Sequence, residues 1–269
     1  MPDLYLPAEM VDHVVDHLRD TKDALVNCSL VAKSWVPRTR KHLFADIGFP
    51  TAKSIQSWKE VFPDPSASPA RYTKTLFVDC PEVDVAPEAE MGGWIKGFSR
   101  VEHLEVRARA MDSAFQESAA ALVPFLGFSP AIKSLRVVVP PLPTSQLFNL
   151  ILSFPLLEDL AVITPYMALP AIRSGSEGDA TPTTAQPLSP PMLTGSLELY
   201  LKGGAENFIR RLLSLQDGIH FRKLAWTWFN GEDLSLMMAL VKGCSHTLES
   251  LRIAGELLGA CILHLRPHR

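Results

Sequence analysis

Past residue 49 the chain repeats one pattern of apolar and polar positions, which reads apolar-x-x-Leu-x-apolar. Apolar residues that alternate with polar ones predict a short strand with a single buried face. Weaker copies of the pattern centre on Leu76 and Leu197. The better copies occupy residues 101–106, 132–137, 157–162, 221–226 and 248–253.

The central leucines of these copies follow one another at intervals of 28, 31, 25, 37, 27 and 27 residues. Periods of roughly 20 to 50 residues are typical of solenoids and propellers. Between the copies, apolar residues recur every three to four positions, which predicts one helix with one buried face per repeat. The clearest of these helical stripes cover residues 115–126, 147–154, 234–241 and 257–265.

One strand and one helix per repeat resembles the leucine-rich repeat. The resemblance implies that parallel strands form an inner, concave sheet and that helices form the outer rim. The Asn or Cys that such repeats usually carry beyond the strand is missing, so we expect an irregular arc. The residues at that place are Arg109, Pro140, Pro165, Lys202, Phe229 and Glu256. The alternative is an α/β domain with a parallel sheet covered on both faces, although such strands should be almost entirely apolar.

Alternation along each strand also predicts which residues face away from the core. If Leu104 and Val106 are buried, Glu105 and Arg107 lie on the concave face, which we expect to hold a target protein. A merely solvated sheet face is the alternative. Over all copies, the predicted residues of this face are Glu105, Arg107, Arg136, Asp159, Glu198, Tyr200, Lys223 and Arg252.

Residues 166–192 interrupt the repeats. They are rich in Pro, Ser, Thr, Gly and Ala, and such a composition cannot offset the entropy cost of ordering the chain. The sequence therefore predicts a flexible insertion within one repeat.

The first fifty residues predict three short helices. Pro7 suits the first turn of a helix, a second helix is expected over residues 23–28, and a third from Ser29 toward Phe44. Pro37 lacks a backbone donor and should kink or restart the third helix. A segment this small usually cannot bury so many apolar side chains without a partner.

The order of these residues resembles the F-box, whose pattern is Leu-Pro, Glu, apolar positions at helical spacing, then Leu-Val-x-Lys/Arg-x-Trp. The matching residues are Leu6, Pro7, Glu9, Met10, Val14, Leu18, Leu30, Val31, Lys33 and Trp35. F-box segments insert into the Skp-family adaptor of SCF-type cullin-RING ubiquitin ligases, so the resemblance implies the adaptor and, through it, cullin and RING subunits as partners. The implied adaptor contacts are Leu6, Pro7, Met10, Val14, Leu25, Val31 and Trp35. The alternative is a helical cap on the repeats, with Trp35 as a core residue.

The composition narrows the classes of partner. A net charge of -3 and a pI near 6.2 give no broad positive field for nucleic acid or an anionic membrane. No apolar stretch approaches the roughly 20 residues of a spanning helix, and the N-terminus lacks the pattern of a secretory signal. Four cysteines without a C-x-x-C pair fit a reducing compartment. We therefore expect a cytoplasmic or nuclear protein.

Motifs for chemistry are weak. His13 and His17 lie one helical turn apart, a spacing that can hold zinc, but this pair falls inside the F-box pattern and we expect no metal. No phosphate loop, dinucleotide fingerprint or nucleophile elbow is present, and we expect no cofactor.

The sequence thus predicts an α+β protein with an F-box at residues 1–48 and a leucine-rich-repeat-like solenoid at residues 49–269. Its expected function is to bind a target protein for a ubiquitin ligase without catalysing a reaction itself. Two alternatives are a repeat scaffold that acts outside the ligase and an intracellular hydrolase or transferase whose site assembles from distant residues.

Overall fold

The computed structural model describes nine ranges of the chain, and every structural statement below concerns these ranges. They are residues 7–80, 93–108, 125–138, 144–164, 191–200, 205–215, 218–227, 234–255 and 259–264. The predicted insertion lies outside them, apart from residues 191 and 192. The positions of the missing Asn or Cys also lie outside them, as do residues 115–124 of the first helical stripe.

Strands of the described ranges form a single sheet in which each strand pairs with its neighbours in sequence. The strands β1 to β8 run parallel, and β9 is antiparallel to β8. Their bounds are β1 (Asp46–Phe49), β2 (Thr75–Cys80), β3 (His103–Ala108), β4 (Ser134–Val138), β5 (Asp159–Ile163), β6 (Ser196–Tyr200), β7 (Lys223–Thr227), β8 (Ser250–Gly255) and β9 (Gly259–His264). The predicted parallel sheet of alternating strands and helices is confirmed.

The register of the sheet aligns the repeats. The central leucines of the sequence pattern pair directly across strands β2 to β8, and all are buried. They are Leu76, Leu104, Leu135, Leu160, Leu197, Leu224 and Leu251. The apolar residue two positions later, such as Val106 or Val137, is buried beside them. One face of the sheet is therefore a continuous apolar layer.

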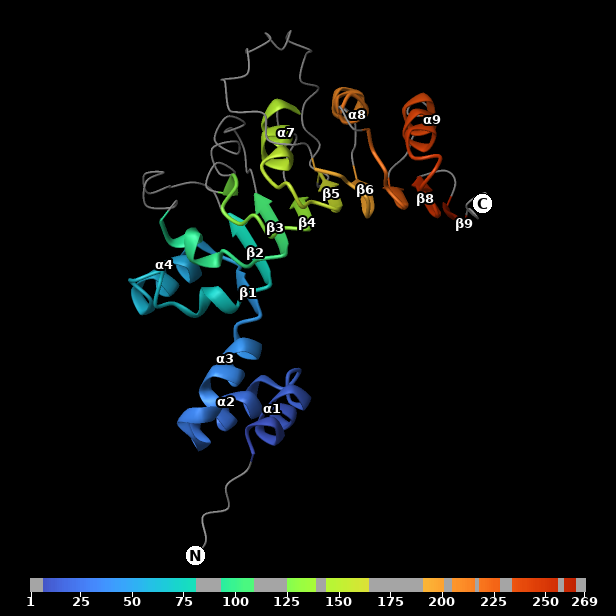
Figure 1. The fold of residues 1–269 in the computed structure, drawn as a ribbon. Coiled ribbons are helices and arrows are strands. Elements are labelled where there is room, and N and C mark those ends of the chain that lie inside the picture. The colour runs from blue at the N-terminus through green and yellow to red at the C-terminus, as the bar shows by residue number, and fades with distance from the viewer. Residues whose placement is uncertain are drawn as a thin grey trace, which may run out of the picture.

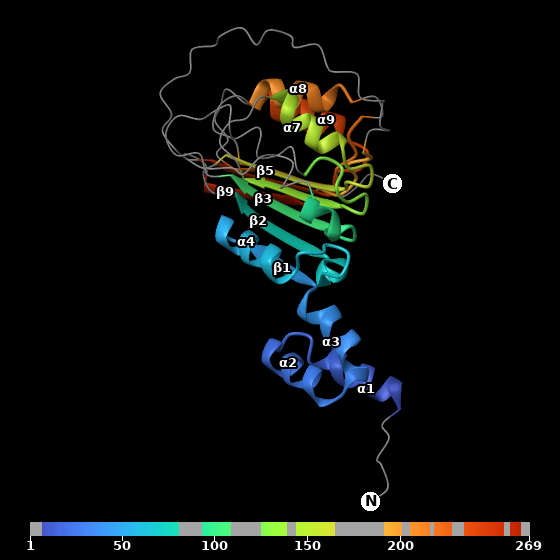
Figure 2. The ribbon, with the colours of Figure 1, turned by 90° about the vertical axis from the view of Figure 1, so that its left-hand side faces the viewer.

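Helices cover this layer from one side. Figure 1 shows the strands following an arc, with α4, α7, α8 and α9 on its outer side, and Figure 2 shows α7, α8 and α9 stacked together over the sheet. The helices are α4 (Ala52–Val61), α7 (Thr144–Leu152), α8 (Ala205–Leu213) and α9 (Leu234–Gly243), with short 3-10 turns η2 (Pro69–Tyr72) and η3 (Lys96–Phe98). The sheet and these helices enclose one large core.

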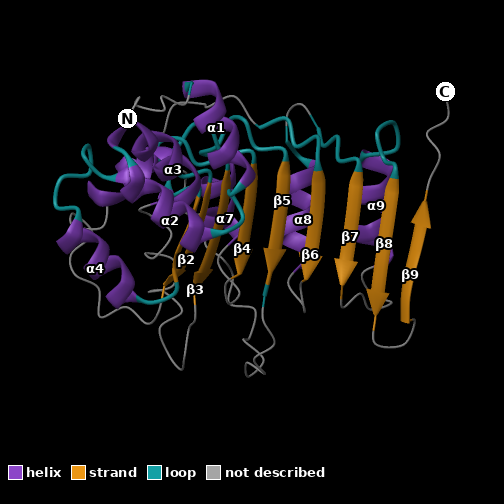
Figure 3. Ribbon diagram, turned by 90° about the horizontal axis from the view of Figure 1, so that it is seen from below, coloured by secondary structure: helices purple, strands orange, loops and turns teal. Residues whose placement is uncertain are grey.

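The opposite face of the sheet is open. In Figure 3 the strands β4 to β9 lie in front of the helices, and no described helix covers them from this side. Residues that alternate with the buried ones point to this side, and those described are half-buried or exposed except Asp79 of β2, which is buried. We call it the open face.

Before the sheet lies a separate bundle of helices, as predicted, formed by α1 (Ala8–His17), α2 (Lys22–Val31) and α3 (Val36–Leu43), with a 3-10 turn η1 (Lys33–Trp35) before α3. The second helix is longer than expected. The third starts only at Val36, after the extended backbone of Ala32, and Pro37 lies in its first turn.

The bundle is joined to the sheet through the backbone of one residue. The carbonyl of Ala45 accepts hydrogen bonds from the amides of Lys74 (2.7 Å) and Thr75 (3.0 Å), which begin β2. Phe44 also packs edge-on against Trp58 of α4, with ring centroids 6.3 Å apart. These contacts fix the bundle at the first-strand end of the arc (Figure 1).

One predicted helix is wrong. Residues 259–264 of the stripe at 257–265 form β9, not a helix. A short apolar run fits a period of two as well as a helical period, and Gly259 disfavours a helix. Pairing with β8, where Ile253 faces Cys261, also covers the edge of β8, and β9 becomes the last strand of the sheet.

No helix in the described part of the chain is long and apolar enough to cross a membrane.

Candidate functional site

The helical bundle has a small core of its own, separate from the core of the sheet. Val11, Val15 and Leu25 are its buried residues, and Leu18, Trp35 and Leu43 pack against them from more exposed positions. Three buried apolar side chains are a small core for a bundle of three helices. The bundle therefore leaves much of its apolar surface outside.

Exposed apolar side chains are concentrated on α1 and α2. Two pairs are spaced four residues apart, so each pair shares one side of its helix: Met10 with Val14, and Val26 with Leu30. Leu30 is 79% exposed and Val31 is 67% exposed. We call the five residues Met10, Val14, Val26, Leu30 and Val31 the apolar surface of the bundle.

The predicted adaptor contacts differ in their exposure. Pro7, Met10, Val14 and Val31 are exposed. Trp35 is half-buried because its indole packs against the bundle core. Leu6 lies outside the described residues.

Leu25 requires a correction. It is fully buried between the helices, so it stabilises the bundle and offers no surface to a partner. The next residue, Val26, is exposed on the same helix, and the sequence prediction did not include it. The sequence of α2 is apolar on more than one side, so nothing in it distinguishes Leu25 from Val26 before the helices are packed.

A charged cluster ties α1 to α3. The guanidinium of Arg38 donates to both carboxylate oxygens of Asp16, with 2.6 Å between Nε and Oδ1, and His42 Nε2 lies 2.7 Å from the same Oδ1. Hydrogen bonds from Arg38 and then His42 hold the pKa of Asp16 well below its usual range. The cluster therefore holds α1, which carries Met10 and Val14 of the apolar surface, against α3.

The histidine pair with zinc-binding spacing lies beside the same cluster. His13 and His17 are exposed, with ring centroids 6.0 Å apart, and the nearby carboxylate of Asp16 is already engaged by Arg38. Within the described residues, no group of three His, Cys, Asp or Glu side chains is placed to hold a metal ion.

A second candidate surface crosses the open face. Along one row of the register, Phe77 of β2 is followed by Glu105, Arg136, Ala161, Glu198, Ala225 and Arg252 on successive strands. Three residues of this row, Glu105, Arg136 and Glu198, form a network with Arg107 of β3 that we call the charge ladder.

Contacts within the charge ladder run across four strands. Arg107 bonds Glu105 at 2.7 Å, Arg136 approaches Glu105 at 3.9 Å, and Arg136 Nη1 lies 3.2 Å from Glu198 Oε2. Arg136 reaches β6 because the intervening residue of β5 is Ala161, whose side chain is too short to block it. The guanidinium of Arg107 also stacks over Phe77, 4.8 Å from the ring centre. The sequence prediction missed Phe77 and Ala161.

Asp159 has a mainly structural role. Its Oδ1 accepts hydrogen bonds from the backbone amide (2.6 Å) and hydroxyl (2.7 Å) of Ser196. A Cβ on Gly195 would lie only 2.4 Å from that oxygen, which explains the glycine at this position. Asp159 therefore connects β5 to β6 and is less available to a ligand than we predicted.

The remaining predicted residues lie toward the other end of the open face. Lys223 and Arg252 are exposed, and among the described residues neither has an ion-pair partner. Tyr200 is half-buried on β6, and its carbonyl accepts hydrogen bonds from the amide and hydroxyl of Thr164.

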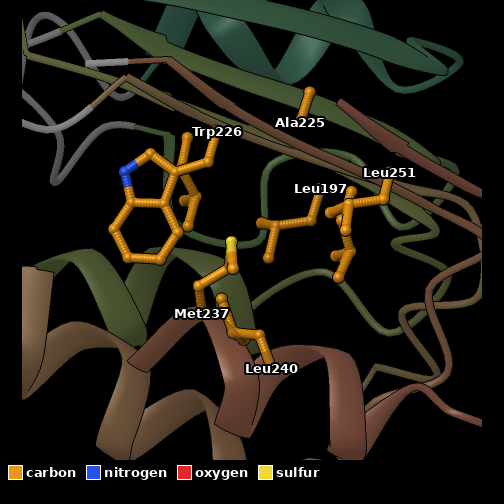
Figure 4. A pocket seen from close by; sticks show the side chains of 8 residues that line it. Leu197, Ala225, Trp226, Met237, Leu240 and Leu251 are labelled. Atoms are coloured by element: carbon orange, nitrogen blue, oxygen red, sulfur yellow. The ribbon is translucent and has the colours of Figure 1, made fainter. Parts of the chain in front are cut away.

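A small pocket lies on the other side of the sheet, beneath α9 (Figure 4). Trp226, Leu197 and Leu251 point from the strands toward Met237 and Leu240 of the helix, whereas Ala225 points away from them. All lining residues are apolar, so this pocket offers no group for acid-base or nucleophilic chemistry.

Comparison with known proteins found no matching family model, no matching curated protein and no matching solved structure.

Proposed function

We propose that this protein is a non-catalytic substrate receptor of an SCF-type ubiquitin ligase. Its bundle would bind a Skp-family adaptor, and through it the cullin and RING subunits, while its open face would bind the protein to be ubiquitinated. In this role it accelerates the reaction by proximity alone, because it brings a lysine of the target close to the ubiquitin-charged enzyme. Such a protein would act in the cytoplasm or the nucleus.

The observation that carries the proposal is the imbalance of the bundle. It buries three apolar residues completely or nearly so and exposes five large ones on α1 and α2. Apolar side chains gathered in this way mark sites of protein association. All of them except Val26 match positions of the F-box pattern, and the resemblance implies that Met10, Val14 and Val31 contact the adaptor.

The arc supports the second half of the proposal. Its parallel strands follow one another in chain order, and the described helices of the arc lie on one side of the sheet, which supports a degenerate leucine-rich repeat. Doubly wound α/β sheets, by contrast, change strand order and carry helices on both faces. A repeat arc of this kind offers its concave face to a protein.

A specific observation favours a second candidate, a repeat scaffold that acts outside the ligase. Leu25 and Trp35 both contribute to the bundle core, so part of the pattern that resembles an F-box also serves internal packing. In this case the bundle would cap the arc and the open face would bind a partner without any adaptor.

Titration of the full chain with a purified Skp-family adaptor separates the two candidates. Val31 and Val61 form a matched pair, because each is 67% exposed but Val61 lies on α4 of the arc. We expect binding at micromolar or lower concentration. Val31→Glu should weaken it at least about tenfold through burial of a charge, and Val61→Glu should not change it. A wild-type chain that ignores the adaptor at micromolar concentration would refute the ligase role.

A further inference from the structure

The open face is symmetric about Glu198. Across strands β4 to β8 the central row reads Arg136, Ala161, Glu198, Ala225 and Arg252. Each arginine lies two strands from the glutamate with one alanine between. Neighbouring strands are about 4.8 Å apart, so both guanidinium groups have the same distance to cover.

Only one of the two arginines contacts the glutamate. Arg136 Nη1 lies 3.2 Å from Glu198 Oε2, whereas Arg252 is exposed and has no ion-pair partner among the described residues. The pair that forms shows that an arginine on this face can contact a carboxylate two strands away when the residue between them is an alanine. The equivalent position beside Arg252 also lies over a small side chain, that of Ala225.

A second cation borders that place. Lys223 lies two residues before Ala225 on β7, so its side chain is on the same face, and it too is exposed with no ion-pair partner in the described ranges. Lys223 pairs with Ser250 in the register, which makes Arg252 its diagonal neighbour, about 7 to 8 Å away. Two cations at this separation can both contact one carboxylate.

The charges of the open face are thus divided unequally. On β3 to β6 the charge ladder pairs two arginines with two glutamates, and Asp159 is held by Ser196. On β7 and β8 the described charged residues that face this side are Lys223 and Arg252. Of the two halves, this one would attract an anion.

We infer that Arg252 and Lys223 form a carboxylate-binding clamp above Ala225, and that the target protein presents an acidic segment to it. The inference rests on the proposed function, since it names the kind of target that the open face would take. Arg136 positions the clamp indirectly: by holding Glu198, it keeps that internal carboxylate away from Arg252.

The role of Arg136 gives the inference a signature that simple charge attraction lacks. In Arg136→Met, Glu198 is released and can turn across Ala225 to pair with Arg252, which blocks the clamp from within. In the double variant Arg136→Met/Glu198→Gln the internal competitor is gone, and binding of an acidic ligand should return.

The experiment measures fluorescence anisotropy of a short labelled peptide of alternating Glu and Ser residues, titrated with the full chain at low salt. A Gln/Ser peptide and a phosphoserine peptide form the other arms. We expect Arg252→Met to weaken binding of the Glu peptide about tenfold, since a charge-assisted contact is lost. Arg136→Met should weaken it by a similar factor, because the released Glu198 then pairs with Arg252 and competes with the peptide. Lys242→Met, which removes an exposed cation on α9, should leave binding unchanged.

Several results would overturn the clamp. They are equal binding of the Gln/Ser peptide, preference for the phosphoserine peptide alone, an equal loss in Lys242→Met, unchanged binding in Arg136→Met, and no binding at all. Circular dichroism verifies the fold of each variant. Titration of the same samples with the adaptor keeps the two proposals apart, because a chain that binds the adaptor and ignores the acidic peptide refutes the clamp alone.

Discussion

Arg38 in α3 donates from its Nε to Oδ1 of Asp16 in α1 across 2.6 Å, and its second nitrogen bonds the other carboxylate oxygen. This two-pronged contact, with His42 beside it, joins the first and last helices of a bundle whose apolar core is very small. A polar contact can contribute a larger share of the stability of such a bundle than of a large domain, because few buried side chains stabilise the bundle.

Replacement of Asp16 tests this role. Asp16→Asn keeps the shape of the side chain but removes the charge that Arg38 and His42 contact. The group is partly exposed, so we expect the bundle to lose about 1 kcal/mol of stability. Chemical denaturation followed by circular dichroism measures the change. Asp12→Asn is the comparison, since Asp12 is exposed on the same helix and interacts with Arg38 only through longer-range charge attraction, so it should have a smaller effect.

Acid should weaken the same contact. The pKa of Asp16 is lowered in the folded protein from an ordinary value of 3.8, chiefly by hydrogen bonds from Arg38. A lowered pKa means that the stabilising effect is complete above the unfolded value and is lost as pH falls through the folded value. The difference in unfolding free energy between wild type and Asp16→Asn should therefore be constant above about pH 5 and shrink below about pH 4. A difference that grows on acidification would contradict the assignment.

Trp35 should have two separable effects. Its indole packs against the bundle core, so Trp35→Ala should destabilise the bundle by about 2 kcal/mol, less than for a fully buried aromatic residue. If Trp35 is also a central anchor, adaptor binding should weaken by about 2 to 4 kcal/mol. Calorimetric titration at a temperature where circular dichroism shows the variant folded distinguishes these effects. Unchanged affinity would remove Trp35 from the contacts.

Two cysteines should differ in reactivity. Burial raises the pKa of Cys244 to about 11, and since the thiolate is the reactive form, this residue should resist alkylation at neutral pH. Cys28 is partly exposed and should be labelled first. Mass spectrometry of peptides after brief iodoacetamide treatment gives the order, and early modification of Cys244 in the folded chain would show that the α9 end opens readily.

The sequence predicts the sheet well because one rule governs it. Alternation around Leu104 and Leu135 defines strand, buried face and open face together, and alignment of the central leucines also gives the observed register. Alternation does not predict how far a side chain extends across neighbouring strands. The contact from Arg136 to Glu198 depends on the small size of Ala161 between them, a relationship that appears only when three strands lie side by side.

The bundle is harder to predict because its helices are short and apolar on several sides. Leu25 and Val26 are adjacent and chemically alike, yet one is buried and the other exposed, and only the packing of three helices decides which. The error at Cys261 has a related origin, since a few apolar residues fit a helix or a strand until the free edge of β8 selects the strand.

The amide of Ala45 donates to the carbonyl of His42 at the end of α3, and its carbonyl accepts from the amides of Lys74 and Thr75, so one residue connects the last helix of the bundle directly to the sheet. If the bundle binds a ligase adaptor and the arc binds a target protein, the relative orientation of the two partners is fixed by this connection. This orientation would then determine which lysines of the target come within range of the transferring enzyme. Inserting residues at Ala45 should therefore change the pattern of modified lysines before it changes the affinity for either partner.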